Sequence, residues 1–410
     1  VIPSELLADG SVVTAKIADD AVTGAKIENA VTIATSVTSP LIDGQNFKIN
    51  GGQGTDGQLL TSTGSGVAWE DAPAGGPTFK TFGTASLMIG SNSTGTINAA
   101  DYNTAVSTTS FAALTTGDFN VAFGEQSLDA LTTGGGNTAL GVSTLGALTT
   151  ANNNTAVGIS ALTSTTDGTV NTAVGSDAMA ANTTGSYNVA VGSLALDANT
   201  TGGENTAIGY TALSSNTTGG WNTALGRATI GGNTTGQHNV GIGHAALGGN
   251  TSYNVAVGNY SLTSASHTGG SNTAVGYTAL RYNTSGNRNT AVGYEAGRDT
   301  TTATKNTVMG YGCGNEITTG SNNTFMGDNA GTNNTTANNN TLIGKGAGDE
   351  ITTSGQNTVI GQGASISSGT SQGNEVVLGQ GLTGIGYHQG ILGGVNGVYN
   401  QPNSTTFAQT

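Results

Sequence analysis

Four histidines and one cysteine are among the residues in this chain that could bind a metal or activate a nucleophile. His238 and His244 lie on either side of a turn glycine, and neither has a cysteine or carboxylate at metal-ligand spacing. His267 and His388 likewise lack such partners, and Cys313 has no second cysteine for an intrachain disulfide. Other copies of a repeat place alanine where Cys313 stands, so we expect a small buried side chain there. These residues predict no metal site, no cofactor and no enzyme.

Two glycine-rich strings also fail as catalytic motifs. Residues 51–57 and 384–390 lack the lysine and adjoining serine or threonine of a phosphate-binding loop, so both strings predict turns. No insertion with clustered carboxylates is present to act as acid and base on a glycan. A glycan depolymerase is therefore the least favoured function.

Aromatic and imidazole rings recur just after a turn glycine and just before an asparagine, and two more lie near the C-terminal end. Flat rings with polar groups can stack on sugar faces, which is how a fibre could hold a surface glycan. The alternative is that the rings shield turns or pack between chains. The candidate glycan or receptor contacts are Tyr187, Tyr210, Trp221, His238, His244, Tyr253, Tyr277, Tyr294, Tyr311, Tyr387 and His388.

A repeat positions these rings. Copies of the pentapeptide Asn-Thr-Ala-Val-Gly begin every 17 residues from Asn103 to Asn357, with degenerate outer copies at Ser86 and Glu375. The exceptional intervals are 15 residues from Asn239, and 18 residues from Asn254 and from Asn357. A fixed period of this length indicates stacked structural repeats, and the short and long intervals predict loop-length changes on one face.

Apolar residues recur within each copy, which is numbered here from its asparagine. Position four always holds a sizeable apolar residue, from Ile89 to Leu378, and we expect that row to face inward. Position five is glycine in every copy except at Ser107, which predicts a turn with positive φ or a close backbone contact. Position nine is apolar from Phe111 to Leu280 and then mostly glycine, so the core should change near residue 290. No apolar row is expected between positions ten and seventeen.

The repeat predicts an all-β parallel β-roll or β-solenoid, with two short strands and two turns in each thin 17-residue coil. Because such a coil buries little surface, we expect self-association, with three chains burying the remaining apolar row at a shared axis as an intertwined homotrimer. The asparagines at position one should stack their side-chain amides along the axis of the solenoid. The predicted ladder includes Asn137, Asn154, Asn171, Asn205, Asn272 and Asn289.

Composition shifts divide the chain into four parts. Residues 1–45 repeat short β-prone units and should form an extended leader for attachment and trimerisation; residues 46–77 should form a small β-connector and a Pro/Gly linker. Residues 78–380 hold the repeats, and residues 381–410 leave the period as a cap or a binding tip.

Charge and hydropathy limit the partners. The chain has 10 basic and 24 acidic residues, a formal net charge of −14, and no basic stripe, which argues against nucleic acid as a partner. No apolar run approaches the ~18 residues of a membrane-spanning helix, so no membrane insertion is expected.

Copies such as residues 205–213 and 272–280 resemble the head repeats of trimeric autotransporter adhesins, which are trimeric left-handed parallel β-rolls. Residues 14–22, 24–31 and 57–69 resemble the virion-proximal part of bacteriophage tail fibres. The resemblance implies a virion fibre that attaches to the host surface, binds a baseplate or tail protein through its N-terminal region, and contacts host glycan. The alternatives are a bacterial surface adhesin, located extracellularly or on the cell surface, and an ice-binding solenoid, which regular threonine columns would suit.

Overall fold

The computed structural model describes residues 48–49, 52–53, 58–62, 67–71, 79–82, 86–89, 100–369, 373–394, 397–402 and 408–409. The chain divides into two compact units, Val1–Ala74 and Gly75–Thr410. The leader predicted for residues 1–45 lies outside the described residues.

The first unit contains two short antiparallel pairs. Strand β1 (Lys48–Ile49) pairs with β2 (Gly52–Gln53), and β3 (Gln58–Ser62) pairs with β4 (Val67–Asp71). The short β-prone runs predicted for this part of the chain thus form strands.

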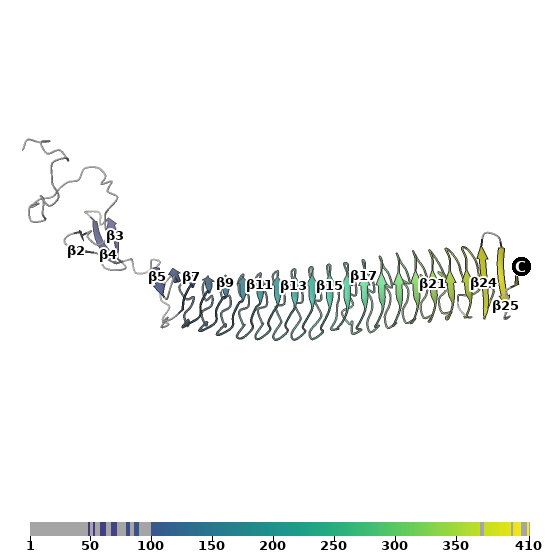
Figure 1. Ribbon diagram of the computed structural model, residues 1–410, viewed down its shortest axis with the longest axis horizontal. Helices are drawn as coiled ribbons and strands as arrows, with labels where there is room; N and C mark the ends of the chain where they lie inside the picture. The colour runs from purple at the N-terminus through teal and green to yellow at the C-terminus, as the bar shows by residue number, and fades with distance from the viewer. Residues whose placement is uncertain are drawn as a thin grey trace, which may run out of the picture. The chain divides into compact units, whose positions relative to one another are not determined.

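The second unit is a β-solenoid in which one strand from each coil adds to a single sheet (Figure 1). Strands β6 to β24 pair in parallel with identical repeat positions opposite one another, so that Thr155 lies beside Thr172. The strands are β5 (Phe79–Phe82), β6 (Ser86–Ile89), β7 (Thr104–Val106), β8 (Val121–Phe123), β9 (Thr138–Leu140), β10 (Thr155–Val157), β11 (Thr172–Val174), β12 (Val189–Val191), β13 (Thr206–Ile208), β14 (Thr223–Leu225), β15 (Val240–Ile242), β16 (Val255–Val257), β17 (Thr273–Val275), β18 (Thr290–Val292), β19 (Thr307–Met309), β20 (Thr324–Met326), β21 (Thr341–Ile343), β22 (Thr358–Ile360), β23 (Val376–Leu378), β24 (Gln389–Gly394), β25 (Gly397–Pro402) and β26 (Ala408–Gln409).

Each regular coil has one strand, so the prediction of two strands per coil was wrong. Positions two to four form the strand because threonine and valine favour extended backbone. The glycine at position five ends it, with φ of 131° at Gly158 and 138° at Gly175. A Cβ on Gly158 would lie 2.5 Å from the carbonyl oxygen of Gly175 in the next coil, so both predicted reasons for glycine hold there. The rest of the coil is a series of turns.

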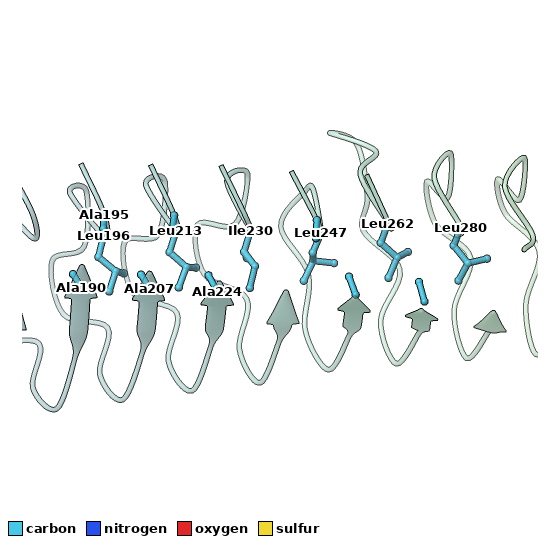
Figure 2. Packing of buried hydrophobic residues seen from close by; sticks show 14 of the residues in the cluster. Ala190, Ala195, Leu196, Ala207, Leu213, Ala224, Ile230, Leu247, Leu262 and Leu280 are labelled. Atoms are coloured by element: carbon cyan, nitrogen blue, oxygen red, sulfur yellow. The ribbon is translucent and has the colours of Figure 1, made fainter. Parts of the chain in front are cut away.

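The prediction that position four faces inward was also wrong. Side chains alternate across the strand, and the small residue at position three points into the core, as at Ala190 and Ala207. Valine, leucine and isoleucine at position four are partly or largely exposed; Leu225, for example, is 45% exposed. Position-nine residues such as Leu196 lie close to the strand alanines in the same core (Figure 2), and their bulk accounts for the small residue at position three.

Position nine lies in a turn with left-handed backbone, not in a strand. Leu196 has φ of 53° and Leu213 also has φ of 53°, and both side chains are fully buried. A third buried row, at position twelve, includes Leu114 and Leu131. The expectation of no apolar row between positions ten and seventeen was therefore wrong in these coils.

The core changes composition where the sequence predicts it. From residue 297 onward glycine takes most position-nine sites, and position three grows from alanine to Val308, Phe325 and Leu342. A Cβ on Gly331 would lie 2.7 Å from the Phe325 ring, so the strand side chain now reaches across to the turn. Volume lost on one side of the coil is replaced from the other side.

Antiparallel strands cover both ends of the parallel stack. Strand β5 pairs with β6 at one end, and β25 pairs with β24 at the other. An exposed parallel edge would be a site for unwanted pairing, and a covering segment removes it. Whether the 381–410 segment acts as a cap or as a binding tip stays a prediction.

Candidate functional site

Position one forms a buried asparagine ladder, as the sequence predicts. The Oδ1 atom of Asn188 accepts hydrogen bonds from the backbone N–H of Asn205 at 2.9 Å and from its Nδ2 at 3.1 Å. Asn188 Nδ2 also donates to the carbonyl oxygen of Gly202 at 2.9 Å. Equivalent bonds join Asn137, Asn154 and Asn171. The ladder binds consecutive coils together, so its role is structural.

Both degenerate outer copies end this ladder with suitable polar groups. Ser86 Oγ accepts the backbone N–H of Asn103 at 2.9 Å. Glu375 is fully buried, donates its backbone N–H to Asn357 Oδ1, and accepts hydrogen bonds from Ser367 with its carboxylate. Because no further asparagine follows, the N–H and hydroxyl of Ser367 supply the donors to this last rung.

A second asparagine ladder lies at position twelve, which sequence reasoning read only as a turn. Asn199 Nδ2 donates to Asn182 Oδ1 at 2.8 Å, and Asn216 and Asn233 continue the series at 2.9 and 3.1 Å. All four residues are fully buried. The repeated Asn-Thr-Thr-Gly motif was the available signal, because its asparagine recurs with the coil period.

The rings that directly precede the repeat asparagine were predicted to form one column, and they form separate stacks. Trp221 stacks on His238 with centroids 5.0 Å apart, and His238 stacks on Tyr253 at 5.1 Å. Nearer the N-terminal end, Tyr102 stacks on Phe119 at 5.0 Å with an interplanar angle of 2°. These residues, each directly before the next repeat asparagine (position seventeen in a regular coil), have left-handed backbone and extend into solvent.

The ring column after the glycine is longer than predicted. Tyr277, Tyr294 and Tyr311 stack at centroid spacings of 5.2 Å. Tyr260, which was not among the candidates, lies edge-on between His244 and Tyr277, and the Arg281 guanidinium lies 5.4 Å from its ring centroid. Tyr260 was missed because the residue stands at position seven, one place beyond the column.

Stacking within a column uses the ring faces that a sugar would need. Inside the stacks only ring edges remain open, and a free face is left only at the end of a stack. Tyr187 and Tyr210 are 61% and 51% exposed and belong to no ring stack among the described residues. Tyr387 and His388 contact each other with ring centroids 3.7 Å apart. Whether any of these candidates binds glycan stays a prediction.

Few charges surround the rings. Glu295 beside Tyr294 raises the pKa of the tyrosine hydroxyl, because its carboxylate disfavours a second negative charge. Arg298 binds Asp299 at 2.8 Å and Glu295 at 3.2 Å.

Burial raises the pKa of Cys313 to about 12, which leaves the thiol protonated and unreactive at neutral pH. Within the part of the chain that the structure describes, no cluster of three or more potential metal ligands occurs, and no helix has the length and apolar character to cross a membrane.

The outer face of the sheet carries a row of exposed apolar side chains. Threonine or valine at position two and an apolar residue at position four point outward in the same strand, as in Thr206 and Ile208. The strand register aligns these residues coil after coil. The result is an apolar column beside a threonine-rich one, and its exposed members include Phe123, Leu140, Val191, Ile208, Leu225, Ile242, Met309, Met326, Ile360 and Leu392.

No family model matches this sequence, and neither the search of curated proteins nor the search of solved structures finds a significant match.

The arrangement thus offers binding surfaces and no reactive constellation within the described residues. The interior holds the coils together through hydrogen bonds, while the outer sheet face and the ring columns are available for contacts. These two surfaces suit association with another chain and recognition of a ligand, respectively.

Proposed function

We propose that this chain is a structural and adhesive fibre protein of a phage virion, assembled as a homotrimer that attaches to a host surface. The observation that carries the proposal is the exposed apolar column at position four. Monomeric soluble proteins rarely expose a contiguous apolar patch beyond a few hundred Å². Three copies placed around one axis would bury three such columns against one another.

The mass in solution tests the trimer. We expect light scattering to give three times the chain mass of 40.2 kDa. Leu225→Glu would place three carboxylates at the shared axis, where burial of like charges is unfavourable, and should shift the mass toward the monomer. Thr218→Glu, at an exposed turn, is the matched control and should leave the trimer intact. A wild-type monomer would contradict the proposal.

The cellular location is a separate part of the proposal. The resemblance of residues 14–31 and 57–69 to tail fibres supports attachment to a baseplate or tail protein by the N-terminal region. Electron microscopy with an antibody to the repeats should label fibres that project from virions. Label on bacterial cells alone would favour the surface adhesin.

The same sheet face favours ice binding as a second candidate. Outward threonines at position two, such as Thr206 and Thr223, lie in register beside the apolar column. Rows of hydroxyl and methyl groups on a parallel sheet could order water. A trimer that buries this face would exclude that use, whereas a monomer with measurable thermal hysteresis would support it and would overturn the fibre proposal.

A further inference from the structure

The ring column at position seventeen has a gap one coil beyond Phe119. Tyr102 and Phe119 stack with centroids 5.0 Å apart, so a third ring would belong one coil further along. Gly136 stands there and has no side chain, and Asn153 takes the same position in the following coil. Because nothing continues the stack at Gly136, Phe119 ends it, and its ring is 61% exposed.

A groove of about 500 Å³ occupies this gap. Its volume falls within the usual range for small-ligand sites. The walls combine the aromatic ring with hydroxyl, amide and carboxylate groups. The lining residues are Thr116, Asp118, Phe119, Thr133, Gly135, Gly136, Asn152 and Asn153.

The backbone does not require glycine at residue 136. Its φ is 70°, and the rings that occupy the same position elsewhere have similar values, 60° at Phe119 and 61° at Tyr187. A Cβ on Gly136 would approach only the side chain of Asn153 closely, with Oδ1 at 2.6 Å, and that flexible group can move. The fold therefore could accommodate a side chain at residue 136, and the absence of one leaves the groove open.

We propose that this groove binds one sugar ring of a neutral glycan, stacked on the free face of Phe119 in the place of the missing rung. The Thr116 and Thr133 hydroxyls and the Asn153 amide offer both donors and acceptors, which a polyhydroxylated ring can use. Asp118 adds a carboxylate, and the chain carries a net charge of −14, so anionic ligands such as nucleotides are disfavoured. The site adds to the proposed fibre function and does not depend on the trimer.

Ligand-detected NMR on the intact protein tests the site. The probes are single hexoses, 6-deoxyhexoses and N-acetylhexosamines, together with their oligosaccharides. We expect at least one to bind wild type with a Kd on the order of 1 mM. Phe119→Ala should weaken binding roughly tenfold, because it removes the stacking surface. Gly136→Tyr should abolish binding by filling the gap with a third stacked ring.

Val170→Tyr is the matched control for Gly136→Tyr. Residue 170 takes the same coil position with φ of 57°, three coils beyond Phe119, so this variant adds a ring outside the groove and should bind as wild type does. The proposal is overturned if no probe binds, if binding survives both Phe119→Ala and Gly136→Tyr, or if indole binds as well as the best sugar and competes with it. None of these results bears on the mass of the trimer, so the two proposals fail separately.

Discussion

At the scale of single residues, side-chain amides do much of the work of stability. Each position-one asparagine connects its own coil to both neighbours: the Oδ1 of Asn188 accepts from Asn205 in the next copy, and its backbone N–H and Nδ2 donate to Asn171 Oδ1 in the preceding copy. These groups are fully buried, and a buried donor or acceptor without a partner costs about 1–3 kcal/mol. One asparagine therefore supports several backbone groups at once.

Asn188→Ala should lower the local unfolding free energy by about 2–4 kcal/mol. The change leaves the Asn205 N–H and the Gly202 carbonyl without their side-chain partner. Amide hydrogen exchange should show lost protection in coils 171–221, with little change in distant coils. Thr218→Ala, an exposed substitution, is the control. Equal protection in both variants would mean that the ladder adds little stability.

At the scale of the element, coils on the two sides of residue 290 place the bulky core residue on opposite sides, in the turn before it and mostly in the strand after it. Coils such as 188–204 combine Ala190 with Leu196, whereas coil 323–339 combines Phe325 with Gly331. The two solutions should not be interchangeable one residue at a time, because protein interiors are close-packed.

A double-mutant cycle tests this exchange. Phe325→Ala alone should cost about 3–5 kcal/mol by leaving a cavity. Gly331→Leu alone should cost about 1–3 kcal/mol, because its side chain would overlap the Phe325 ring. The double variant should be clearly less destabilised than the sum, as read by hydrogen exchange in coils 323–356. Phe325→Ala combined with the distant Leu196→Ala should be additive. If the free-energy losses of Phe325→Ala and Gly331→Leu simply add, the two residues do not compensate for each other in the core.

The sequence predicted the period, the parallel stacking, the Asn137 to Asn289 ladder and the core change near residue 290. It failed on which strand residue faces inward, because the larger residue was assumed to be buried. Ala190 takes that place since Leu196 already fills the core, and this information lies in the packing of two segments rather than in either one. The position-twelve ladder was missed because polarity there was equated with exposure. Tyr260 and the groove beside Phe119 depend on neighbouring coils, which a single repeat does not show.

At the scale of the solenoid unit, the irregular coils 239–253 and 254–271 interrupt the middle of the stack, and a third length change lies in the 18-residue coil that begins at Asn357. Both length changes follow position nine, at Leu247 and Leu262, and so lie on one side as the sequence predicted. A Cβ on Gly249 would clash with the backbone of His267, so the loop of the long coil lies directly against the short coil. Asn250 Oδ1 accepts the N–H groups of the preceding turn in place of a missing residue.

The interior row at position twelve has buried polar atoms without partners at these coils, as it also has at Asn334. His267, the fourteenth residue of its 18-residue coil, takes the place of the position-twelve asparagine there; it is fully buried and contacts the Asn283 carbonyl through Nδ1 at 3.2 Å. Its Nε2 atom and both side-chain polar atoms of Asn283 are buried without a hydrogen-bond partner. Because repeat arrays are stabilised mainly by contacts between neighbours, a weak interface at this point limits cooperation between the two halves of the stack.

Acid should weaken this interface. Burial lowers the pKa of His267 below its ordinary value of 6.5, so the unfolded chain binds a proton that the folded chain excludes. The stability that depends on neutral His267 is therefore present above pH ~6.5 and is lost as the pH falls toward the folded pKa, at up to ~1.4 kcal/mol per pH unit. Asp129, Asp197 and Asp349 act in the opposite sense, because burial raises their pKa values.

Comparison with His267→Asn separates the histidine from these carboxyl groups, which both proteins share. Asparagine is the residue that Asn233 and Asn283 place at the same coil position, so the variant should fold. Hydrogen exchange, corrected for the intrinsic effect of pH, should show wild-type coils 239–288 losing protection between pH 7 and pH 5, while the variant keeps it. If the wild type and the variant lose protection equally, the acid sensitivity arises from groups other than His267. A loss confined to the wild type would show that one buried ring sets where the solenoid first opens.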